Sequence, residues 1–90
     1  MFTNKTSDHR NNVCGRKVAL VRKQMHISQR ALAERLQLIG HDVDKNAVQR
    51  IESGQRFVTD IELIALSRVL QLTYDELLTD GEAPSEPKEQ

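Results

Sequence analysis

The chain has one cysteine, few aromatic residues and no long apolar run, and each shortage excludes a class of protein. Cys14 cannot form a disulfide within the chain, which indicates a reducing compartment. Aromatic residues make up 3% and tryptophan is absent, which argues against an aromatic platform for stacking single-stranded nucleic acid. No apolar run approaches the about 20 residues that span a bilayer, and the polar start at 3–8 does not resemble a secretory signal. The sequence therefore predicts a soluble, cytoplasmic protein without membrane contact.

Motifs of common catalytic and metal sites are also missing. There is no glycine-rich phosphate loop, no nucleophile elbow and no paired-histidine motif. Zinc ligands come in close pairs, a spacing not found among Cys14, His9, His26 and His41. Ninety residues form at most one small domain, which leaves little room for a water-excluding catalytic pocket. We expect no enzymatic activity, no metal and no cofactor.

Charge is balanced overall but unevenly distributed along the chain. Residues 1–56 carry eleven Lys or Arg against five Asp or Glu, a net charge of +6. Residues 57–90 carry two against eight, a net charge of −6. Such polarity can orient a protein on a polyanion, although an ordinary solvated surface gives the same counts. The charge pattern alone leaves both interpretations open.

Composition divides the chain into three parts. Residues 1–12 are polar and unpatterned, which predicts a flexible arm. Residues 81–90 are acidic and contain both prolines, which predicts a disordered tail or the start of a linker. Between them, residues 13–80 place their apolar side chains at helical spacing, without a period-two strand. The fold class predicted is all-α, a five-helix domain with disordered tails at both ends.

The first three helices are predicted from apolar spacing and caps. The first covers about 13–24, with four apolar residues on one face: Cys14, Val18, Val21 and Met25. Ser28 is an N-cap for the second, whose buried stripe is Leu32, Ala33 and Leu36. Asp44 is an N-cap for the third, which turns Val48 and Ile51 inward and ends at Ser53-Gly54.

Two capping boxes predict where the last two helices begin. The pairs are Thr59 with Glu62 and Thr73 with Glu76, each three residues apart. In the fourth helix we expect the inward residues to be Ile61, Ile64, Ala65 and Val69. The fifth helix is short and ends near Thr79, with Leu77 and Leu78 packing back onto the domain.

Residues 28–36 read Ser-Gln-Arg-Ala-Leu-Ala-Glu-Arg-Leu, and residues 46–54 read Asn-Ala-Val-Gln-Arg-Ile-Glu-Ser-Gly. This pair of segments resembles the phage repressor and Cro-type (XRE) helix-turn-helix family, in which the first segment packs across a recognition helix. The resemblance continues through 64–70 and 74–78, and so covers most of the predicted domain. It implies a transcriptional regulator, a repressor, that binds a double-stranded DNA operator as a homodimer in the cytoplasm or nucleoid of a bacterium.

The third predicted helix, 45–53, carries the candidate base-reading residues. Because Val48 and Ile51 point inward, the outward face consists of Lys45, Asn46, Gln49 and Arg50. Arg and Lys can donate to guanine O6 and N7, and Asn and Gln can pair with adenine N6 and N7. A solvated helix face could carry the same residues.

The resemblance also implies residues that support the reading helix. It places phosphate contacts at Gln29, Ser53 and Arg56, and Arg30 is a plausible fourth. A polar residue ending a helix is an alternative interpretation of Ser53. The resemblance further implies a structural salt bridge between Arg22 and Glu52.

The turn before the third helix departs from the family, because residues 37–44 make it longer. We expect the second helix to extend through Leu38 and to end at Gly40. Burial of Leu38, Ile39 and Val43 is then expected, under the first or fourth helix. The longer turn can tilt the third helix. His26 and Gln71 stand where the family commonly ends its first and fourth helices with glycine.

An alternative function keeps the fold but replaces the DNA with a protein partner. The chain would then antagonise a repressor or serve as an antitoxin, and its acidic half would suit such contacts. Fold alone does not decide between these functions.

Overall fold

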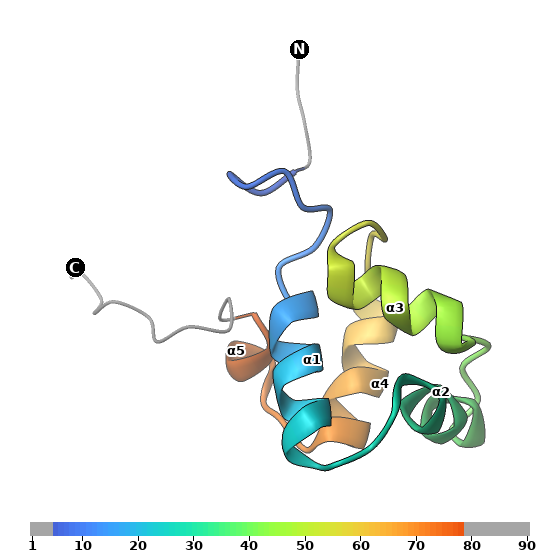
Figure 1. Cartoon of the computed structure of the whole chain (residues 1–90). Coiled ribbons are helices and arrows are strands. Elements are labelled where there is room, and N and C mark those ends of the chain that lie inside the picture. The colour runs from blue at the N-terminus through green and yellow to red at the C-terminus, as the bar shows by residue number, and fades with distance from the viewer. Residues whose placement is uncertain (1–4, 79–90) are drawn as a thin grey trace.

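The computed structural model describes residues 5–78, which contain five helices and no strand (Figure 1). The helices are α1 (Gly15–Gln24), α2 (Gln29–Leu38), α3 (Lys45–Ser53), α4 (Asp60–Leu70) and α5 (Tyr74–Leu77). The all-α prediction with five helices is confirmed. The predicted acidic tail, 81–90, lies outside the described residues, as do residues 1–4 and 79–80.

Four of the helices begin at the caps that the sequence predicts. Ser28 Oγ accepts a hydrogen bond from the Ala31 amide at 3.0 Å, and Asp44 Oδ1 accepts from the Ala47 amide at 2.8 Å. Both capping boxes are complete: each threonine accepts from the glutamate amide, and each glutamate accepts from the threonine amide. These bonds satisfy amide groups that have no partner within the helix.

A residue with positive φ follows each of the first four helices. Gly40 has φ of 96° and Gly54 has φ of 85°, values that glycine adopts without a steric penalty. His26 and Gln71 also have positive φ, 60° and 57°, although each carries a Cβ. His26 and Gln71 stand where the family commonly has glycine. They adopt the backbone conformation of glycine at a cost of about 1 kcal/mol each.

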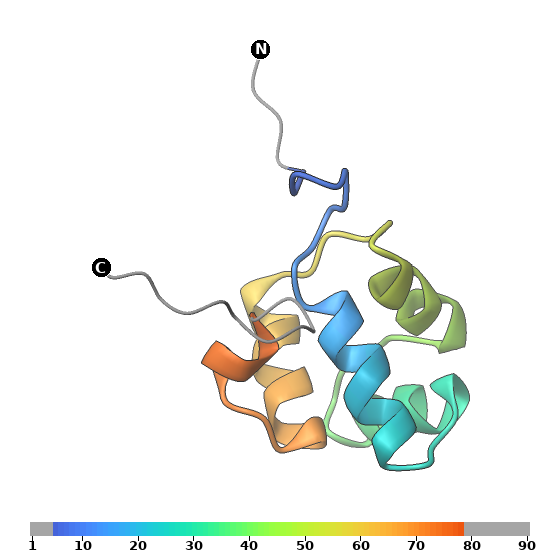
Figure 2. The same ribbon diagram turned by 60° about the vertical axis from the view of Figure 1, so that its left-hand side comes forward.

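The core lies where α1 and α4, which run side by side, meet the pair formed by α2 and α3 (Figures 1 and 2). α5 covers α1 and α4 on the other side. The most deeply buried side chains come from all five helices and the residue before α1: Cys14, Val18, Leu32, Val48, Ile51, Leu66 and Leu77. Full burial of one such aliphatic side chain contributes about 1.5–3 kcal/mol. Burial also raises the pKa of the Cys14 thiol to about 11, so the thiol is protonated at neutral pH.

Two of the three burial predictions for residues 38–43 are wrong. Leu38 is 84% exposed and Ile39 is 42% exposed, whereas Val43 is buried as expected. The buried stripe of α2 includes Leu36, and Leu38 follows it by two residues, which is about 200° around a helix. Leu38 therefore points away from the core, and only Val43 on the return segment reaches it.

The inward face of α4 is also shifted from the one predicted. Ala65 is buried and Val69 is partly buried, but Ile61 is 62% exposed and Ile64 is 43% exposed. Leu66 and Leu70 fill the core instead. On α5, Leu77 is fully buried and Leu78, expected to pack inward, is 49% exposed. Apolar residues on both sides of α4 made the choice of face ambiguous, because either stripe has helical spacing.

The N-terminal segment is partly folded onto the domain. The flexible arm was predicted to reach residue 12, but the side chain of Asn12 is buried and donates to the carbonyl oxygens of Ile51 and Arg56 at 3.0 and 2.7 Å. The Asn11 amide donates to the Gly54 carbonyl oxygen at 2.7 Å. The predicted arm is therefore too long, because its last residues supply donors that the end of α3 needs.

Within residues 5–78, every helix is too short or too polar to span a bilayer. In the same part of the chain, no three His, Cys, Asp or Glu side chains lie close enough together to hold a metal ion.

Candidate nucleic-acid interface

The outer face of α3 presents four polar side chains to solvent. Ala47, Val48 and Ile51 attach the helix to the core, as the sequence predicts for the last two. The exposed side chains are Lys45, Asn46, Gln49 and Arg50. Their spacing of one, three and one residues places them on one side of the helix. None of them is in a hydrogen bond or ion pair with another residue in the described part of the chain, so all four are free to bind a ligand.

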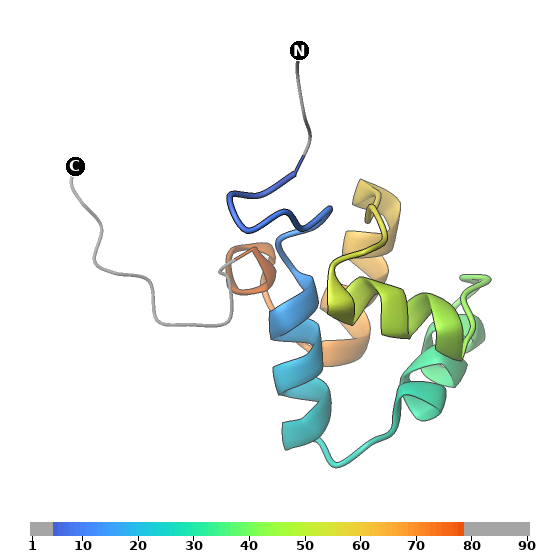
Figure 3. The same cartoon turned by 45° about the horizontal axis from the view of Figure 1, so that its top comes forward.

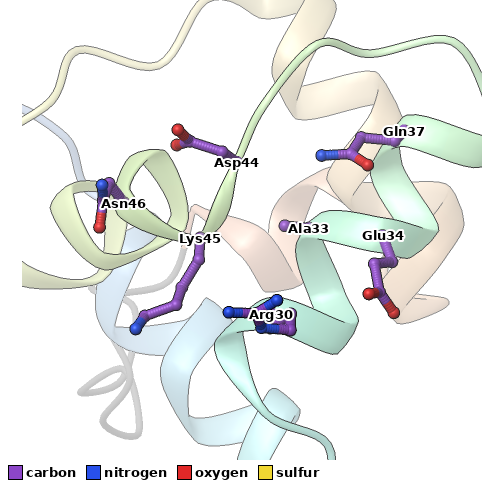
Figure 4. Close-up of a pocket in the computed structure, with 7 residues that line it drawn as sticks. All are labelled: Arg30, Ala33, Glu34, Gln37, Asp44, Lys45 and Asn46. Atoms are coloured by element: carbon purple, nitrogen blue, oxygen red, sulfur yellow. The ribbon is translucent and has the colours of Figure 1, made fainter.

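Helix α2 packs across α3 (Figure 3). Its side chains Arg30, Glu34 and Gln37 bring further polar groups close to the start of α3. Ala33, a small buried residue, lies on the side of α2 that meets α3. A hollow of about 380 Å³ separates the two helices at the start of α3, and its lining residues are Arg30, Ala33, Glu34, Gln37, Asp44, Lys45 and Asn46. Figure 4 shows that Arg30 and Lys45 extend from facing helices toward the same side of the hollow. Two cationic side chains therefore flank one edge of it.

A bidentate ion pair joins α1 to the last turn of α3. Arg22 Nε lies 2.6 Å from Glu52 Oε2, and Arg22 Nη2 donates to Oε1 at 3.1 Å. The side chains are only 12% and 8% exposed. Arg22 also donates to the Ile27 carbonyl oxygen at 2.9 Å. A charge pair this well enclosed fixes the distance between the two helices.

Gln29, predicted to hold a phosphate, lies at the N-terminus of α2 and is hydrogen-bonded to this ion pair. Its Nε2 donates to Glu52 Oε1 at 3.0 Å, so the carboxylate accepts from both α1 and α2. The amide group keeps one N–H that this bond does not use. Glu52 thus orients Gln29 at the start of α2.

The other predicted phosphate residues differ in how free they are. Arg30 is exposed and has no hydrogen-bond or ion-pair partner among the described residues. Ser53 is exposed, and its hydroxyl donates to the Arg50 carbonyl oxygen at 3.3 Å. Arg56 is paired, because its Nη2 lies 2.6 Å from Glu62 Oε2 in the first turn of α4. The sequence pattern predicts Glu62 only as part of the capping box, and the ion pair with Arg56 is a second role that no local pattern indicates.

Four acidic residues lie on a different part of the fold from the outer face of α3. Asp60 and Glu62 occupy the first turn of α4, and Asp75 and Glu76 the first turn of α5. The exposed cations Arg30, Lys45 and Arg50 belong to α2 and α3. These two groups of opposite charge lie on different helices, although α2 and α3 also carry Glu34 and Glu52, and α4 carries Arg68.

Sequence reasoning missed the contacts of Arg10, Asn11 and Asn12 with the end of α3. Arg10 Nη2 donates to the Glu52 carbonyl oxygen at 2.8 Å, next to the contacts of the two asparagines. Asn12 Oδ1 also accepts from the amide of Gly15, the first residue of α1, at 2.9 Å, and asparagine is typical of such local side-chain to backbone bonds before a helix.

α3 exposes a polar face, and α2 packs across α3 with its N-terminus near the same face. Two helices arranged in this way define a helix-turn-helix module. The sequence profile of the helix-turn-helix family matches residues 18–77, two thirds of the chain. The chain belongs to this family, a class of DNA-binding transcriptional regulators.

Two solved structures share this fold at 27% sequence identity. One is the restriction-modification controller protein C.AhdI from Aeromonas hydrophila, which matches over 70% of this chain and 84% of its own, with a TM-score of 0.61. The other is the P22 c2 repressor protein in complex with the synthetic operator 9T, which matches over 79% of this chain and 98% of its own, with a TM-score of 0.63. A search of curated proteins gives no match.

Proposed function

We propose that this chain is a transcriptional repressor that binds double-stranded operator DNA, with α3 in the major groove. The observation that carries the proposal is the outer face of α3, where four base-compatible side chains are exposed and unpaired. The major groove admits one helix, and a side chain already paired within the protein would have to break that pair before it could read a base. The similarity to a repressor solved with its operator supports the same function.

Each side chain on that face suits a particular contact. Arg50 and Lys45 can donate to guanine O6 and N7, and Arg50 can do so with two parallel bonds. Asn46 and Gln49 can both donate to and accept from adenine. Asn46 lies in the first turn and Arg50 one turn later, so together they span several base pairs of the groove.

Phosphate contacts from neighbouring elements would hold the helix in register. Gln29 at the start of α2 has one N–H available, and Arg30 next to it is unpaired. Ser53 and Arg56 flank the end of α3, although Arg56 must leave Glu62 or share its guanidinium to reach a phosphate. Contacts of this type determine position and orientation without specifying sequence.

Selection of duplexes from a random pool at two salt concentrations tests the proposal. We expect enrichment of one sequence motif, with affinity that falls steeply as salt rises. Arg50→Ala should then weaken binding to the selected duplex about 5- to 150-fold, corresponding to about 1–3 kcal/mol, and relax the preference at one base pair. Competition binding against duplexes with single base-pair changes measures both effects.

Arg30→Ala is the matched control, since it also removes one exposed unpaired arginine. It should weaken binding to selected and unrelated duplexes by similar factors, without relaxing any base preference. A wild-type protein that enriches no motif and shows no salt dependence would contradict the function. That result would favour the protein-interaction alternative, which the acidic residues of α4 and α5 would suit.

We further propose that the repressor acts as a homodimer in the bacterial cytoplasm, through an apolar patch on α4 and α5. The patch consists of Ile61, Ile64, Tyr74 and Leu78, which are 62%, 43%, 53% and 49% exposed. Ile64 and Tyr74 also line a mainly apolar hollow of about 240 Å³ between the two helices. Exposed apolar groups gathered in this way are typical of a surface that another protein covers. A symmetric dimer would place two copies of α3 on half-sites about one helical turn apart.

Ile64→Asp tests the dimer, because it places a charge within the apolar patch. We expect the dissociation constant of the dimer to rise at least about tenfold in sedimentation equilibrium. Binding to a two-half-site duplex should weaken, and binding to a single half-site should not change. Leu38→Asp, at an 84% exposed leucine outside the patch, serves as the control. Equal self-association of both variants and wild type would refute this interface.

A further inference from the structure

Residues 10–12, called the strap from here on, lie along the C-terminal end of α3 (Figures 1 and 3). Arg10 Nη2 donates to the Glu52 carbonyl oxygen at 2.8 Å, and Asn12 Nδ2 donates to the Ile51 carbonyl oxygen at 3.0 Å. These carbonyls belong to the last turn, where the helix itself supplies few donors. The positive charge of Arg10 is also favourable at this negative end of the helix dipole. The strap therefore acts as a C-terminal cap made by a distant segment.

The strap also holds the loop that follows α3. The Asn11 amide donates to the Gly54 carbonyl oxygen at 2.7 Å, and Asn11 Nδ2 donates to that of Gln55 at 2.8 Å. Asn12 Nδ2 donates in addition to the carbonyl oxygen of Arg56 at 2.7 Å. One short segment thus connects the last turn of the proposed reading helix to the proposed phosphate-binding loop.

The strap is itself fixed on both sides. Before it, residues 6–10 form a turn in which the Thr6 amide donates to the Arg10 carbonyl oxygen at 2.7 Å, and the Arg10 amide donates to Thr6 Oγ1 at 2.9 Å. After it, Asn12 is buried and accepts from the Gly15 amide in the first turn of α1. The match to the family profile begins at residue 18, so the strap lies outside the matched residues.

The two ends of α3 are held in different ways. Its N-terminus is capped by Asp44, at the end of the long turn that carries the exposed Leu38 and Ile39. That turn is held by the hydrogen bond from Gln37 Nε2 to the Val43 carbonyl oxygen at 2.8 Å and by the burial of Val43. The strap supplies such contacts at the opposite end, on the backbone of the helix and therefore independently of its base-reading side chains. Precise recognition requires that the helix carrying the binding side chains is itself held in place by hydrogen bonds to its neighbours.

We propose that the strap is a specificity-determining positioning element, which sets the angle at which Lys45, Asn46, Gln49 and Arg50 meet the bases. This inference rests on the proposed DNA-binding function. Arg10 acts on DNA through α3 and its loop and need not touch a base. Loss of its guanidinium should therefore reduce discrimination between duplexes more than it reduces general affinity for DNA.

The test compares Arg10→Met with Arg68→Met, which removes an exposed charge from α4. Dissociation constants are measured for the selected duplex and for an unrelated duplex of equal length, at a temperature where circular dichroism shows each variant folded. For Arg10→Met we expect the specificity ratio to fall about tenfold, while affinity for the unrelated duplex changes by less than about threefold. Arg10→Lys keeps the charge and a donor, so its specificity ratio should lie between those of Arg10→Met and wild type. Arg68→Met should leave the ratio unchanged.

Amide hydrogen exchange provides a second readout that does not involve DNA. Arg10→Met should accelerate exchange of the amides at 53–56, with little change in α2 or α4. Unchanged exchange at 53–56, or an equal loss of affinity for both duplexes, would overturn the role of the strap and leave the proposed function standing. A wild-type protein that binds neither duplex would instead overturn the proposed function, and the specificity role with it, whatever the exchange rates.

Discussion

Replacement of Glu52 with alanine is expected to lower the free energy of unfolding by about 3–5 kcal/mol, because it leaves a buried arginine without its counter-charge. Glu52 forms two bonds to Arg22 and accepts a third from Gln29, and its side chain is 8% exposed. Within residues 5–78, the one bond left to the Arg22 guanidinium would be that to the Ile27 carbonyl oxygen. Urea denaturation followed by circular dichroism measures the change.

Two variants identify the cause of that loss. Glu52→Gln keeps the shape and one acceptor but not the charge. Its free energy of unfolding should therefore lie between those of wild type and Glu52→Ala. Asp8→Ala breaks the exposed pair between Asp8 and Arg16 and should change stability little, since both side chains are more than 40% exposed. A loss for Glu52→Ala no larger than that for Asp8→Ala would show that the enclosed pair contributes no more than a surface pair.

Gly15→Ala is expected to destabilise the domain by about 3 kcal/mol, at the upper end of the usual cost of overpacking. A Cβ at this position would lie 2.0 Å from the Ile51 carbonyl oxygen, 2.6 Å from Arg10 Nη2 and 2.8 Å from Asn12 Oδ1. The nearest of these atoms is backbone, so α1 and α3 would have to separate. Helix propensity alone would favour alanine over glycine here by up to about 1 kcal/mol, so the sign of the change is diagnostic.

Gly40→Ala is the comparison for Gly15→Ala. Nothing lies within 4 Å of a Cβ at Gly40. Gly40→Ala should therefore lower stability only through the positive φ, by about 1–2 kcal/mol. Thermal melts of both variants, converted to free energies at one temperature, give the ranking. Increased stability of Gly15→Ala would mean that the close approach of α1 to the end of α3 is absent in solution.

The parts of the fold predicted from the sequence depend on local interactions. Caps at Ser28, Asp44, Thr59 and Thr73 act within three residues, so their patterns are readable in the sequence. Burial of Val48 and Ile51 also follows from spacing along one helix, which in turn predicts the exposed face of α3. Whether that face reads bases in the assigned way stays a prediction.

The parts that sequence analysis missed depend on contacts between distant residues. Arg10 meets Glu52 across 42 positions, and no local pattern distinguishes such a residue from one in a flexible arm. Ile61 and Ile64 fit a helical stripe as well as the buried residues do, and only the packing of α4 against α1, α2 and α5 selects Leu66 and Leu70. The sequence alone does not indicate that Arg56 forms an ion pair, but in the fold Arg56 is paired with Glu62.

The Arg56–Glu62 pair has a consequence for how ions take part in binding. An unpaired cation that meets a phosphate releases a counterion from the DNA, and this release drives association at low salt. If Arg56 left Glu62 to meet a phosphate, the carboxylate would be exposed and would attract a cation from solution. The release of one ion would then be offset by the uptake of another, so Arg56 could hold the DNA in place while adding little to the salt dependence of binding.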